Sequence, residues 1–463
     1  MAHPDWTLKN ISFLALITVG YIIGEIAHFL IAITSKDTAN SIPYGDQACL
    51  KKAQQTEDFE CQDLKTQDVC DAEQNCEWKY NGQGSDFQFL VGPAFIYTFS
   101  TSALIMGFAL DKFNRPIIMS VGIMVFSVSC VLMGIANSFW QLVVLRMGIA
   151  LGEAVCRPAA SSLIAEVFSP DNRGVANGIF SWGVYFGYGM AYIFGIYLSE
   201  ADVLGYGWRA SYVIGGAPGV LISILIFFTV RDPRKKKEVE KTDEKKPDGK
   251  KTAVVEYLKD LRTAFCQPAM ILLLLSASVR HLAGLSWAQN NANYFREYYE
   301  DDVMNKYGYW LTVCSIVGGS VGVVSGGFIT DILQKKFGLH SRLWVQSGFL
   351  LLATPFAALT VYLEPPYCFI ALALYYFCAE TWFAILFTVI VEIVPSNTRG
   401  ICTAFFLFVM NIIAGSLGIL VEDVGDAIGL KETMYIFFPG LIALDAILFF
   451  LTSLPLYLKS KSK

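Results

Sequence analysis

The sequence predicts an all-α polytopic membrane protein with twelve transmembrane helices in two parallel six-helix halves. The chain is 54% hydrophobic and only 16% charged, whereas a soluble chain has about a quarter charged residues. Its apolar runs recur at about 20 residues, the length a helix needs to cross ~30 Å of hydrocarbon. Two polar motifs that join apolar runs in the first half return in the second half. Together these observations predict the number of helices and their division into two halves.

The apolar runs define twelve predicted spans, each of which must be a helix because lipid cannot hydrogen-bond an exposed backbone. The first has full spanning length and follows no basic segment, so we expect it to remain as a signal anchor rather than to be cleaved. The spans cover residues 11–34, 87–110, 116–136, 139–165, 175–198, 212–230, 267–290, 308–334, 342–363, 367–394, 400–421 and 433–457.

Two hydrophilic stretches interrupt this pattern. Residues 35–86 are acidic on balance, and residues 231–264 are rich in lysine, glutamate and aspartate with few apolar side chains. The second stretch is expected to be a disordered linker between the halves, because it cannot bury enough apolar surface to fold. The predicted organisation is a short N-terminus, an N-terminal half, the linker, a C-terminal half and a tail, at residues 1–10, 11–230, 231–264, 265–457 and 458–463.

Charge predicts the orientation. Basic residues of short connections stay on the cytoplasmic side of a membrane, and Lys112, Arg115, Lys335 and Lys336 share a side with the basic linker. The linker and both termini are therefore expected in the cytoplasm, and residues 35–86 outside it or in a lumen. The membrane itself is expected to be the plasma membrane or an endolysosomal membrane.

The outer loop contains Cys49, Cys61, Cys70 and Cys76. An even number of cysteines in an oxidising compartment predicts two disulfides, for which three connectivities are possible. A zinc site is the alternative, although the spacing contains no CxxC pair. The other seven cysteines lie in or beside apolar runs and are expected to pack as small hydrophobic residues.

The repeated motifs lie at matching positions of the two halves. Gly107-x-x-x-Asp111 returns as Gly327-x-x-x-Asp331, and the connection from Glu166 to Arg173-Gly174 returns from Glu392 to Arg399-Gly400. This repeat is too long for a solenoid. It is typical of duplicated membrane transporters, and it relates the halves without inversion.

These motifs resemble those of the major facilitator superfamily. Gly107, Asp111 and Arg115 resemble its motif between helices 2 and 3, with departures at Lys112, Asn114 and Pro116. A longer series over residues 146–233 resembles the spinster-like branch. That series is Arg146, Gly152-Glu153-Ala154, Pro158, Ser162 to Ala165, Phe168, Arg173, Ala176, Gly178 to Phe180, Gly183, Gly187, Gly189, Gly195, Gly207 to Arg209, Pro218-Gly219 and Arg231 to Pro233.

The resemblance implies the major facilitator fold, with a substrate path between the halves near the bilayer midplane. It also implies that the motif residues at the inner helix ends hold one conformation, with Asp111 meeting the N-terminus of the span 400–421. We call these residues the conformational latch: Gly107, Asp111, Arg115, Arg173, Asp331 and Arg399. The alternative for them is a role in topology alone. In the first span Glu25 occupies the region where the branch has an Asp-Arg pair, and the adjacent arginine is missing.

Ionisable side chains inside the bilayer are functional candidates, because burying them costs several kcal/mol. The candidates for substrate binding and proton coupling are Glu25, His28, Arg146, Glu153, Arg157, Arg280, His281 and Glu380. The alternative for each is a structural ion pair, which is the stronger interpretation for Asp445 and an equal one for Arg146. Glu153 and Glu380 occupy matching positions, whereas Arg157 has no basic counterpart near Ala384.

These residue types permit proton-coupled anion binding. An arginine fork suits a phosphate or a carboxylate, and the proton occupancy of a buried carboxylate beside it can follow the arrival of an anion. Two pairs are favoured, Glu25 with His28 and Glu153 with Arg157. The predicted function is a secondary active transporter of an amphipathic or small organic anion, for which the resemblance suggests a lysophospholipid or a sphingoid phosphate.

Two alternatives stay open: a transporter of sugar phosphates or carboxylates, and a non-transporting receptor or scaffold on the same fold. An enzyme is not expected, because the chain has no GxxxxGK[ST] or HExxH motif. With four scattered histidines we expect no cofactor and no metal site. The expected partners are a small-molecule or lipid substrate and membrane lipids, with no nucleic acid, and the chain is expected to be a monomer.

Overall fold

The computed structural model describes residues 6–51, 61, 66–73, 76–232, 266–299, 303–394 and 399–461. Within them, ten helices are long and apolar enough to cross a membrane. The two other predicted spans are built from shorter helices that follow one another along the chain. The predicted twelve-helix fold is confirmed. The disorder expected for the linker 231–264 concerns residues that, except for Arg231 and Asp232, lie outside the described part of the chain.

The N-terminal half contains six spans in chain order. They are α1 (Leu8–Ile33), α4 (Ser85–Val91) with α5 (Pro93–Lys112), α6 (Arg115–Met133), α7 (Phe139–Glu153) with α8 (Cys156–Val167), α9 (Pro170–Tyr192) with the π-helix η2 (Ile193–Leu198), and α10 (Trp208–Thr229). A short η3 (Val203–Gly205) precedes α10.

The C-terminal half repeats this arrangement. Its spans are α13 (Pro268–Tyr298), α14 (Val303–Val313) with η4 (Cys314–Gly319) and α15 (Ser320–Phe337), α16 (His340–Tyr362), α17 (Tyr367–Ala379) with α18 (Trp382–Ile393), α19 (Arg399–Leu417) with α20 (Leu420–Ile428), and α21 (Leu430–Tyr435) with η5 (Ile436–Gly440) and α22 (Leu441–Lys461).

Local sequence accounts for where several helices begin. The Thr7 side chain accepts a hydrogen bond from the Asn10 amide at the start of α1, and Asn114 accepts one from Ile117 at the start of α6. Such side chains satisfy amides that have no partner within the helix. Prolines occupy the first turns of α5, α6, α9 and α13, where the missing amide hydrogen costs nothing.

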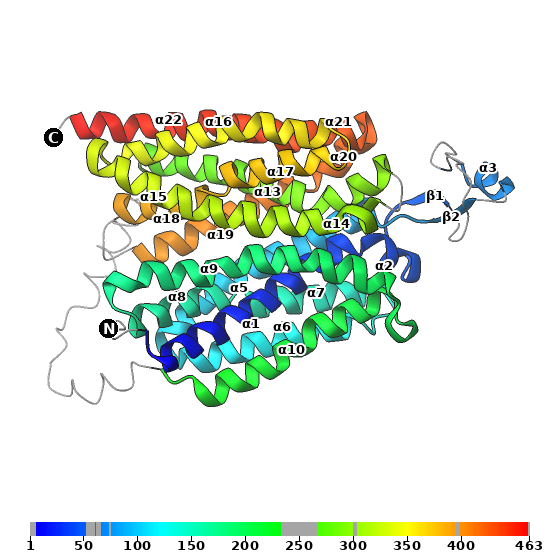
Figure 1. The fold of residues 1–463 in the computed structure, drawn as a ribbon, viewed down its shortest axis with the longest axis horizontal. Helices are drawn as coiled ribbons and strands as arrows, with labels where there is room; N and C mark the ends of the chain where they lie inside the picture. Colours follow the sequence, from blue (N-terminus) through cyan, green and yellow to red (C-terminus); the bar gives the residue numbers. More distant parts are fainter. Residues whose placement is uncertain are drawn as a thin grey trace.

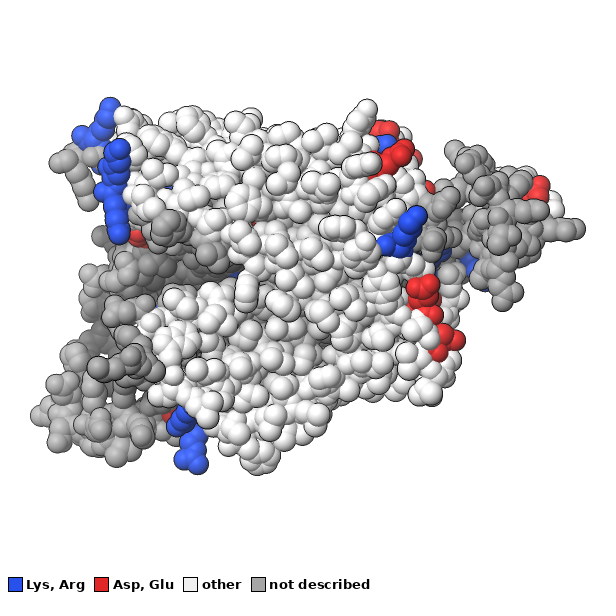
Figure 2. Space-filling view, viewed as in Figure 1, with Lys and Arg blue, Asp and Glu red and all other residues white. Residues whose placement is uncertain are grey.

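The two halves lie side by side, each around its own apolar core (Figure 1). The described ends of the chain lie at one end of the molecule, which we call the terminal end. The strands β1 and β2 project from the other, the hairpin end (Figure 1). Figure 2 shows lysines and arginines at the terminal end and most of the visible acidic side chains at the hairpin end, with an uncharged surface between them. That uncharged band is what a membrane-spanning surface requires.

The hairpin consists of β1 (Gln47–Lys51) and β2 (Cys76–Tyr80), which pair antiparallel with Cys49 opposite Trp78. The helix α2 (Ser35–Ser41) precedes it, and α3 (Gln67–Ala72) lies between the strands in the chain. Disulfides join Cys49 to Cys70 and Cys61 to Cys76. The prediction of two disulfides is confirmed, one of the three connectivities is selected, and the four sulfurs are unavailable to zinc.

Glycine sets the distance between α1 and α9. A Cβ atom at Gly187 would lie 2.4 Å from Cβ of Glu25 and 2.7 Å from the Ile22 carbonyl oxygen. A real Cβ cannot make such contacts, so only glycine lets α9 approach α1 at this level. The close approach holds the backbone of Glu25 against the neighbouring helix.

Two spans are broken at matching places. α7 ends at Glu153 and α8 begins at Cys156, while α17 ends at Ala379 and α18 begins at Trp382, directly after Glu380 and Thr381. The carboxylates that occupy matching positions in the sequence therefore both lie at helix breaks. Discontinuous helices of this kind form the binding sites of many transporters, because their ends leave backbone groups free to bind ligands.

Candidate functional site between the two halves

Three ionisable side chains meet in the interior of the N-terminal half. His28 Nδ1 lies 3.5 Å from Glu153 Oε1 and 4.0 Å from Glu25 Oε2. Glu25 and Glu153 are 5% and 3% exposed, and the His28 ring lies between the rings of Phe29 and Phe95. The structure thus brings together Glu25 and His28, as predicted, and adds Glu153 to them. We call Glu25, His28 and Glu153 the proton cluster.

The proton cluster has unused hydrogen-bonding capacity. Among the described residues, neither nitrogen of His28 has a hydrogen-bond partner, and neither does Glu153 Oε2. Unpartnered buried polar atoms are rare in proteins and call for a specific explanation. These three side chains could also place one ligand atom each around a cation. The sequence-based expectation of no metal site stays a prediction.

Arg146 connects the α7 span to α1. Its Nη1 donates to the backbone carbonyl of His28 at 2.5 Å and more weakly to that of Ala27. Its guanidinium lies 4.3 Å from the centre of the Phe95 ring, and the side chain is only 1% exposed. Arg146 therefore fixes the backbone that carries His28, which fits the structural alternative for this residue.

Arg157 lies on α8, beyond the break that follows Glu153. Its Nη2 and Nε donate to the Tyr21 hydroxyl at 2.8 and 3.3 Å. Tyr21 in turn interacts with Glu25, one helical turn further along α1. The chain of contacts from Arg157 through Tyr21 to Glu25 links the cationic side chain to the proton cluster. Arg157 and Glu153, the pair favoured from the sequence, interact through their charges, while Arg157 donates hydrogen bonds to Tyr21.

The C-terminal half contributes a buried ion pair. Arg280 Nη2 on α13 donates to Glu380 Oε1 at 3.0 Å and to the Ala379 carbonyl at 3.2 Å. The Tyr185 hydroxyl, on α9 of the other half, donates to Glu380 Oε2 at 3.2 Å. Glu380 is therefore bonded to both halves, at the break between α17 and α18.

His281 follows Arg280 on α13. Its ring lies 6.1 Å from that of Trp382, and its side chain interacts with Asn411 on α19. The electrostatic interaction of His281 with His28 spans the two halves. His281 thus belongs to the region between the halves, and no direct contact with the proton cluster is seen among the described residues.

Sequence reasoning missed a row of amide side chains. The predicted span 267–290 continues as α13 to Tyr298 and includes Gln289, Asn290, Asn291 and Asn293, all 5% exposed or less. The span was predicted too short because these amides end the apolar run. They are tolerated inside the protein because each makes at least one hydrogen bond.

Each of these amides hydrogen-bonds the N-terminal half. Gln289 donates to the Val91 carbonyl, and Asn290 accepts from Gln88. Asn291 accepts from Tyr192 and donates to Tyr188, while Asn293 accepts from Ser35. We call Gln289, Asn290, Asn291 and Asn293 the amide row. It closes the space between the halves toward the hairpin end. Four amides in one apolar helix were the available sequence signal.

Tyrosines extend the closure from the amide row toward Glu380. The Tyr188 and Tyr192 hydroxyls lie 2.5 Å apart, and Tyr376 on α17 donates to Tyr188 at 3.4 Å. Tyr188 and Tyr192 thus hold the two halves together in this structure.

The residues of the conformational latch differ in their burial and in their contacts. Arg115 is 2% exposed and bonds Asp232 at 2.7 Å and the Ser162 hydroxyl at 2.6 Å, both in its own half. Gly107 faces open space, with no atom within 4 Å of a Cβ placed there. Arg173 is exposed and donates to the Phe168 carbonyl. The side chains of Asp111, Asp331 and Arg399 lie outside what the structure describes.

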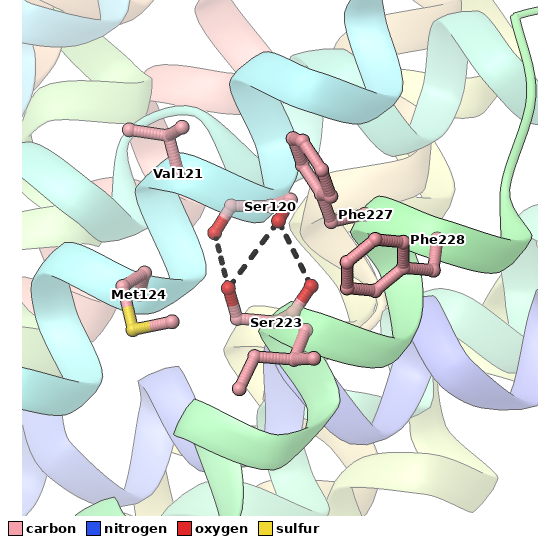
Figure 3. Close-up of a pocket in the computed structure, with 7 residues that line it drawn as sticks. Ser120, Val121, Met124, Ser223, Phe227 and Phe228 are labelled. Carbon is pink, nitrogen blue, oxygen red and sulfur yellow. Dashed lines mark hydrogen bonds between the residues drawn. The ribbon is translucent and has the colours of Figure 1, made fainter.

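An apolar cavity of about 260 Å³ lies away from this region, between α6 and α10. Figure 3 shows Ser120 and Ser223 at its base, where each hydroxyl donates to the other residue's carbonyl at 2.8 Å. Val121, Ile224 and Phe228 around it are exposed on the apolar surface. The serines are satisfied by each other, so this cavity is a helix contact rather than a polar binding site.

Residues 79–419 match the sequence pattern of the Major Facilitator Superfamily. The chain belongs to this superfamily. Protein spinster of Drosophila melanogaster is 24% identical over 264 residues, which cover 55% of this chain and 41% of that protein. The sphingosine-1-phosphate transporter SPNS2 of Mus musculus is 32% identical over 167 residues, 35% of this chain and 29% of its own length. The chain thus matches less than half the length of these relatives.

The fold agrees with that of a solved spinster-like protein. A bacterial homologue of the human lysosomal transporter Spinster, in an inward-facing and unoccupied conformation, superposes with a TM-score of 0.71 at 20% identity. The superposition covers 98% of each chain. At this identity the likeness establishes the shared fold, and the residues between the halves must be interpreted from their own geometry.

Proposed function

We propose that this protein is a proton-coupled secondary active transporter of an amphipathic or small organic anion, with a lysophospholipid or sphingoid phosphate as the first substrate class. The observation that carries the proposal is the proton cluster, which Tyr21 connects to Arg157 between the halves. The name of the SPNS2 relative, a sphingosine-1-phosphate transporter, supports the choice of an anionic amphiphile.

Arg157 is the candidate for binding the anionic group. Its guanidinium lies on α8, is less deeply buried than Arg146, and points to the Tyr21 hydroxyl. A planar guanidinium can bind a phosphate or a carboxylate with two parallel hydrogen bonds. A phosphate that reaches Arg157 would compete with the Tyr21 hydroxyl, and this competition would reach Glu25 through its interaction with Tyr21.

The proton cluster is the candidate for coupling. The two carboxylates and the imidazole each place one atom within 4.8 Å of the others. The two carboxylates cannot both be charged freely, because like charges this close repel strongly in a water-poor interior. The cluster can therefore hold a variable number of protons. Negative charge that arrives at Arg157 shifts the balance between these protonation states, which is the linkage that proton coupling needs.

Alternating access is supported by the contacts between the halves. The amide row and its tyrosine neighbours close the hairpin end, while Gly107 at the terminal end faces open space. We infer that the structure represents a conformation open toward the terminal end. By the distribution of basic residues that end is cytoplasmic, so the disulfide-bonded hairpin faces the outside or a lumen of the plasma membrane or an endolysosomal membrane.

Flux through proteoliposomes tests this proposal. The full-length protein, reconstituted with a labelled lysophospholipid or sphingoid phosphate, is expected to transport it faster with a pH gradient than without one. Arg157→Ala is expected to reduce flux at every pH, and Glu153→Gln to remove the effect of the gradient. Glu392→Gln serves as the matched control, because Glu392 is exposed on α18 and bonds only Gln334 among the described residues. Normal flux in both test variants would refute the proposal.

Two other functions are separated by the same assay. A sugar phosphate or a dicarboxylate in place of the amphiphile tests whether the anionic group alone is recognised. The disulfide-bonded hairpin favours the receptor or scaffold alternative, and that alternative predicts no flux of any of these anions. We propose that the protein acts as a monomer, because each half buries its own core and the two halves together enclose the site.

A further inference from the structure

A third buried carboxylate lies in the C-terminal half, away from the proton cluster. Asp445 on α22 is 0% exposed, and neither carboxyl oxygen has a hydrogen-bond partner among the described residues. α22 packs along α13 and α16. An ionised carboxylate in such a position needs a charged partner or several donors. None is bonded to Asp445 in this conformation, so its neutral form fits the site.

Two donors on the neighbouring helices are also unused. Arg280 Nε on α13 and Gln346 Nε2 on α16 have no hydrogen-bond partner among the described residues. Both side chains are at most 1% exposed. The C-terminal half therefore contains one buried carboxyl group, on α22, that accepts no hydrogen bond from the described residues. It also contains two buried N–H donors, on α13 and α16, that have no acceptor in this part of the chain, and both of these helices pack against α22.

The other atoms of these two side chains hold the break between α17 and α18. Arg280 donates to Ala379 and Glu380, and Gln346 Oε1 accepts from the Thr381 hydroxyl at 2.9 Å. Gly326 on α15 packs directly against Thr381, at 2.5 Å from where its Cβ would lie. Displacement of the break would release Arg280 and Gln346 together. Both would then be available to Asp445.

The charged and titratable groups around Asp445 are few. Arg280 is the charged group whose field acts on it, and Tyr375 on α17 interacts electrostatically with both of them. On α16, the Ser347 hydroxyl donates to the carbonyl of Ala446, the residue that follows Asp445. Arg280 therefore hydrogen-bonds Glu380 and acts on Asp445 only through its charge.

We propose that Asp445 is a second proton-binding site, which is protonated in this conformation and takes Arg280 from Glu380 when the break between α17 and α18 moves. The Asp445 proton passes to Glu380 as that carboxylate loses its arginine, so the total charge of the C-terminal half does not change. Glu380 is more exposed than Asp445, which gives the proton a route to the space between the halves. This inference rests on the proposed transport cycle.

Infrared spectroscopy of the full-length protein in lipid tests the protonation directly and does not depend on transport. A protonated carboxyl group has a C=O stretch that an ionised one lacks, so a pH titration of difference spectra counts such groups. Asp445→Asn is expected to remove one protonated carboxyl band at neutral pH. Asp423→Asn, an exposed carboxylate at the hairpin end, is expected to remove none. An unchanged spectrum in Asp445→Asn would overturn the proposal.

A second variant separates this proposal from a merely buried acid. In Glu380→Gln, Arg280 has no carboxylate on α17, and we expect it to bond Asp445, which then loses its proton to the solution. The variant should therefore lose the protonated band that Asp445→Asn removes, although the substituted residue is 380 and not 445. Retention of that band would contradict the exchange of Arg280. If flux is absent but both infrared results hold, the proposed function fails and the proton site stands.

Discussion

Gly187→Ala is expected to separate α1 from α9 and to disturb the proton cluster. The new Cβ would lie 2.4 Å from Cβ of Glu25, whereas carbon atoms prefer a separation of about 3.5–4.0 Å. The helices must therefore move apart by about 1 Å or more, since the obstructing atoms are a Cβ and a backbone carbonyl rather than the end of a flexible side chain. Overpacking of this kind costs about 1–3 kcal/mol.

Gly178→Ala is the matched control, because Gly178 lies in the same helix and faces open space. There the substitution should add about 0.5–1 kcal/mol of stability through helix propensity alone. In detergent, the unfolding temperature of Gly187→Ala should be lower than that of the unmodified protein, and that of Gly178→Ala should be higher. Flux of the labelled anion should fall in Gly187→Ala and hold in Gly178→Ala. Equal stability of the two variants would refute the packing argument.

Three further outcomes follow from other parts of the molecule. Asp232→Asn should destabilise the N-terminal half by about 3–5 kcal/mol, because it removes the carboxylate that pairs with the buried Arg115 at 2.7 Å. Thermal unfolding measures this loss. If the double variant Arg115→Met/Asp232→Leu regains the stability of the parent, the ion pair is the source of the loss. Replacing Cys61 and Cys76 with serine should cost the hairpin about 3 kcal/mol of loop-closure stabilisation. The hairpin should then be cleaved by a protease, while the membrane spans stay folded. If the variant resists the protease as well as the parent does, the prediction is wrong.

The last outcome concerns pH. Desolvation and the neighbouring Asp426 raise the pKa of Asp46. Because the pKa is raised in the folded state, the stability that Asp46 contributes is present at acidic pH and is lost as pH rises through that pKa. Asp46→Asn should therefore raise the unfolding temperature at alkaline pH and leave it unchanged at acidic pH. A gain of the same size at both pH values would argue against a titrating Asp46.

The sequence predicted the fold because length and hydropathy are local properties of the chain. Each predicted span agrees with a described helix or with consecutive helices, and most boundaries fall within a few residues. The largest departure is α13, where the amide row ended the apolar run before the helix ended at Tyr298. Hydropathy cannot foresee polar groups whose partners come from the other half of the protein.

The candidate site was only partly predictable. Spacing along α1 brought Glu25 and His28 to one face, since residues three apart are neighbours on a helix. It could not reveal that His28 would also face Glu153, because that contact depends on how the α7 span crosses α1. In the same way Arg146 bonds backbone carbonyls, and the bonded partner of Arg280 is Glu380, on a helix far along the chain.

The sequence by itself determined the twelve spans, the two disulfides and the set of ionisable residues inside the membrane, because each of these follows from residue type and spacing. The tertiary structure alone decided which of those residues meet. It joined Cys49 to Cys70, placed Glu380 at a helix break and left the Asp445 carboxyl group without a hydrogen bond among the described residues. Partner choice inside the bilayer depends on helix crossings between segments distant in the chain, and no local pattern records those crossings.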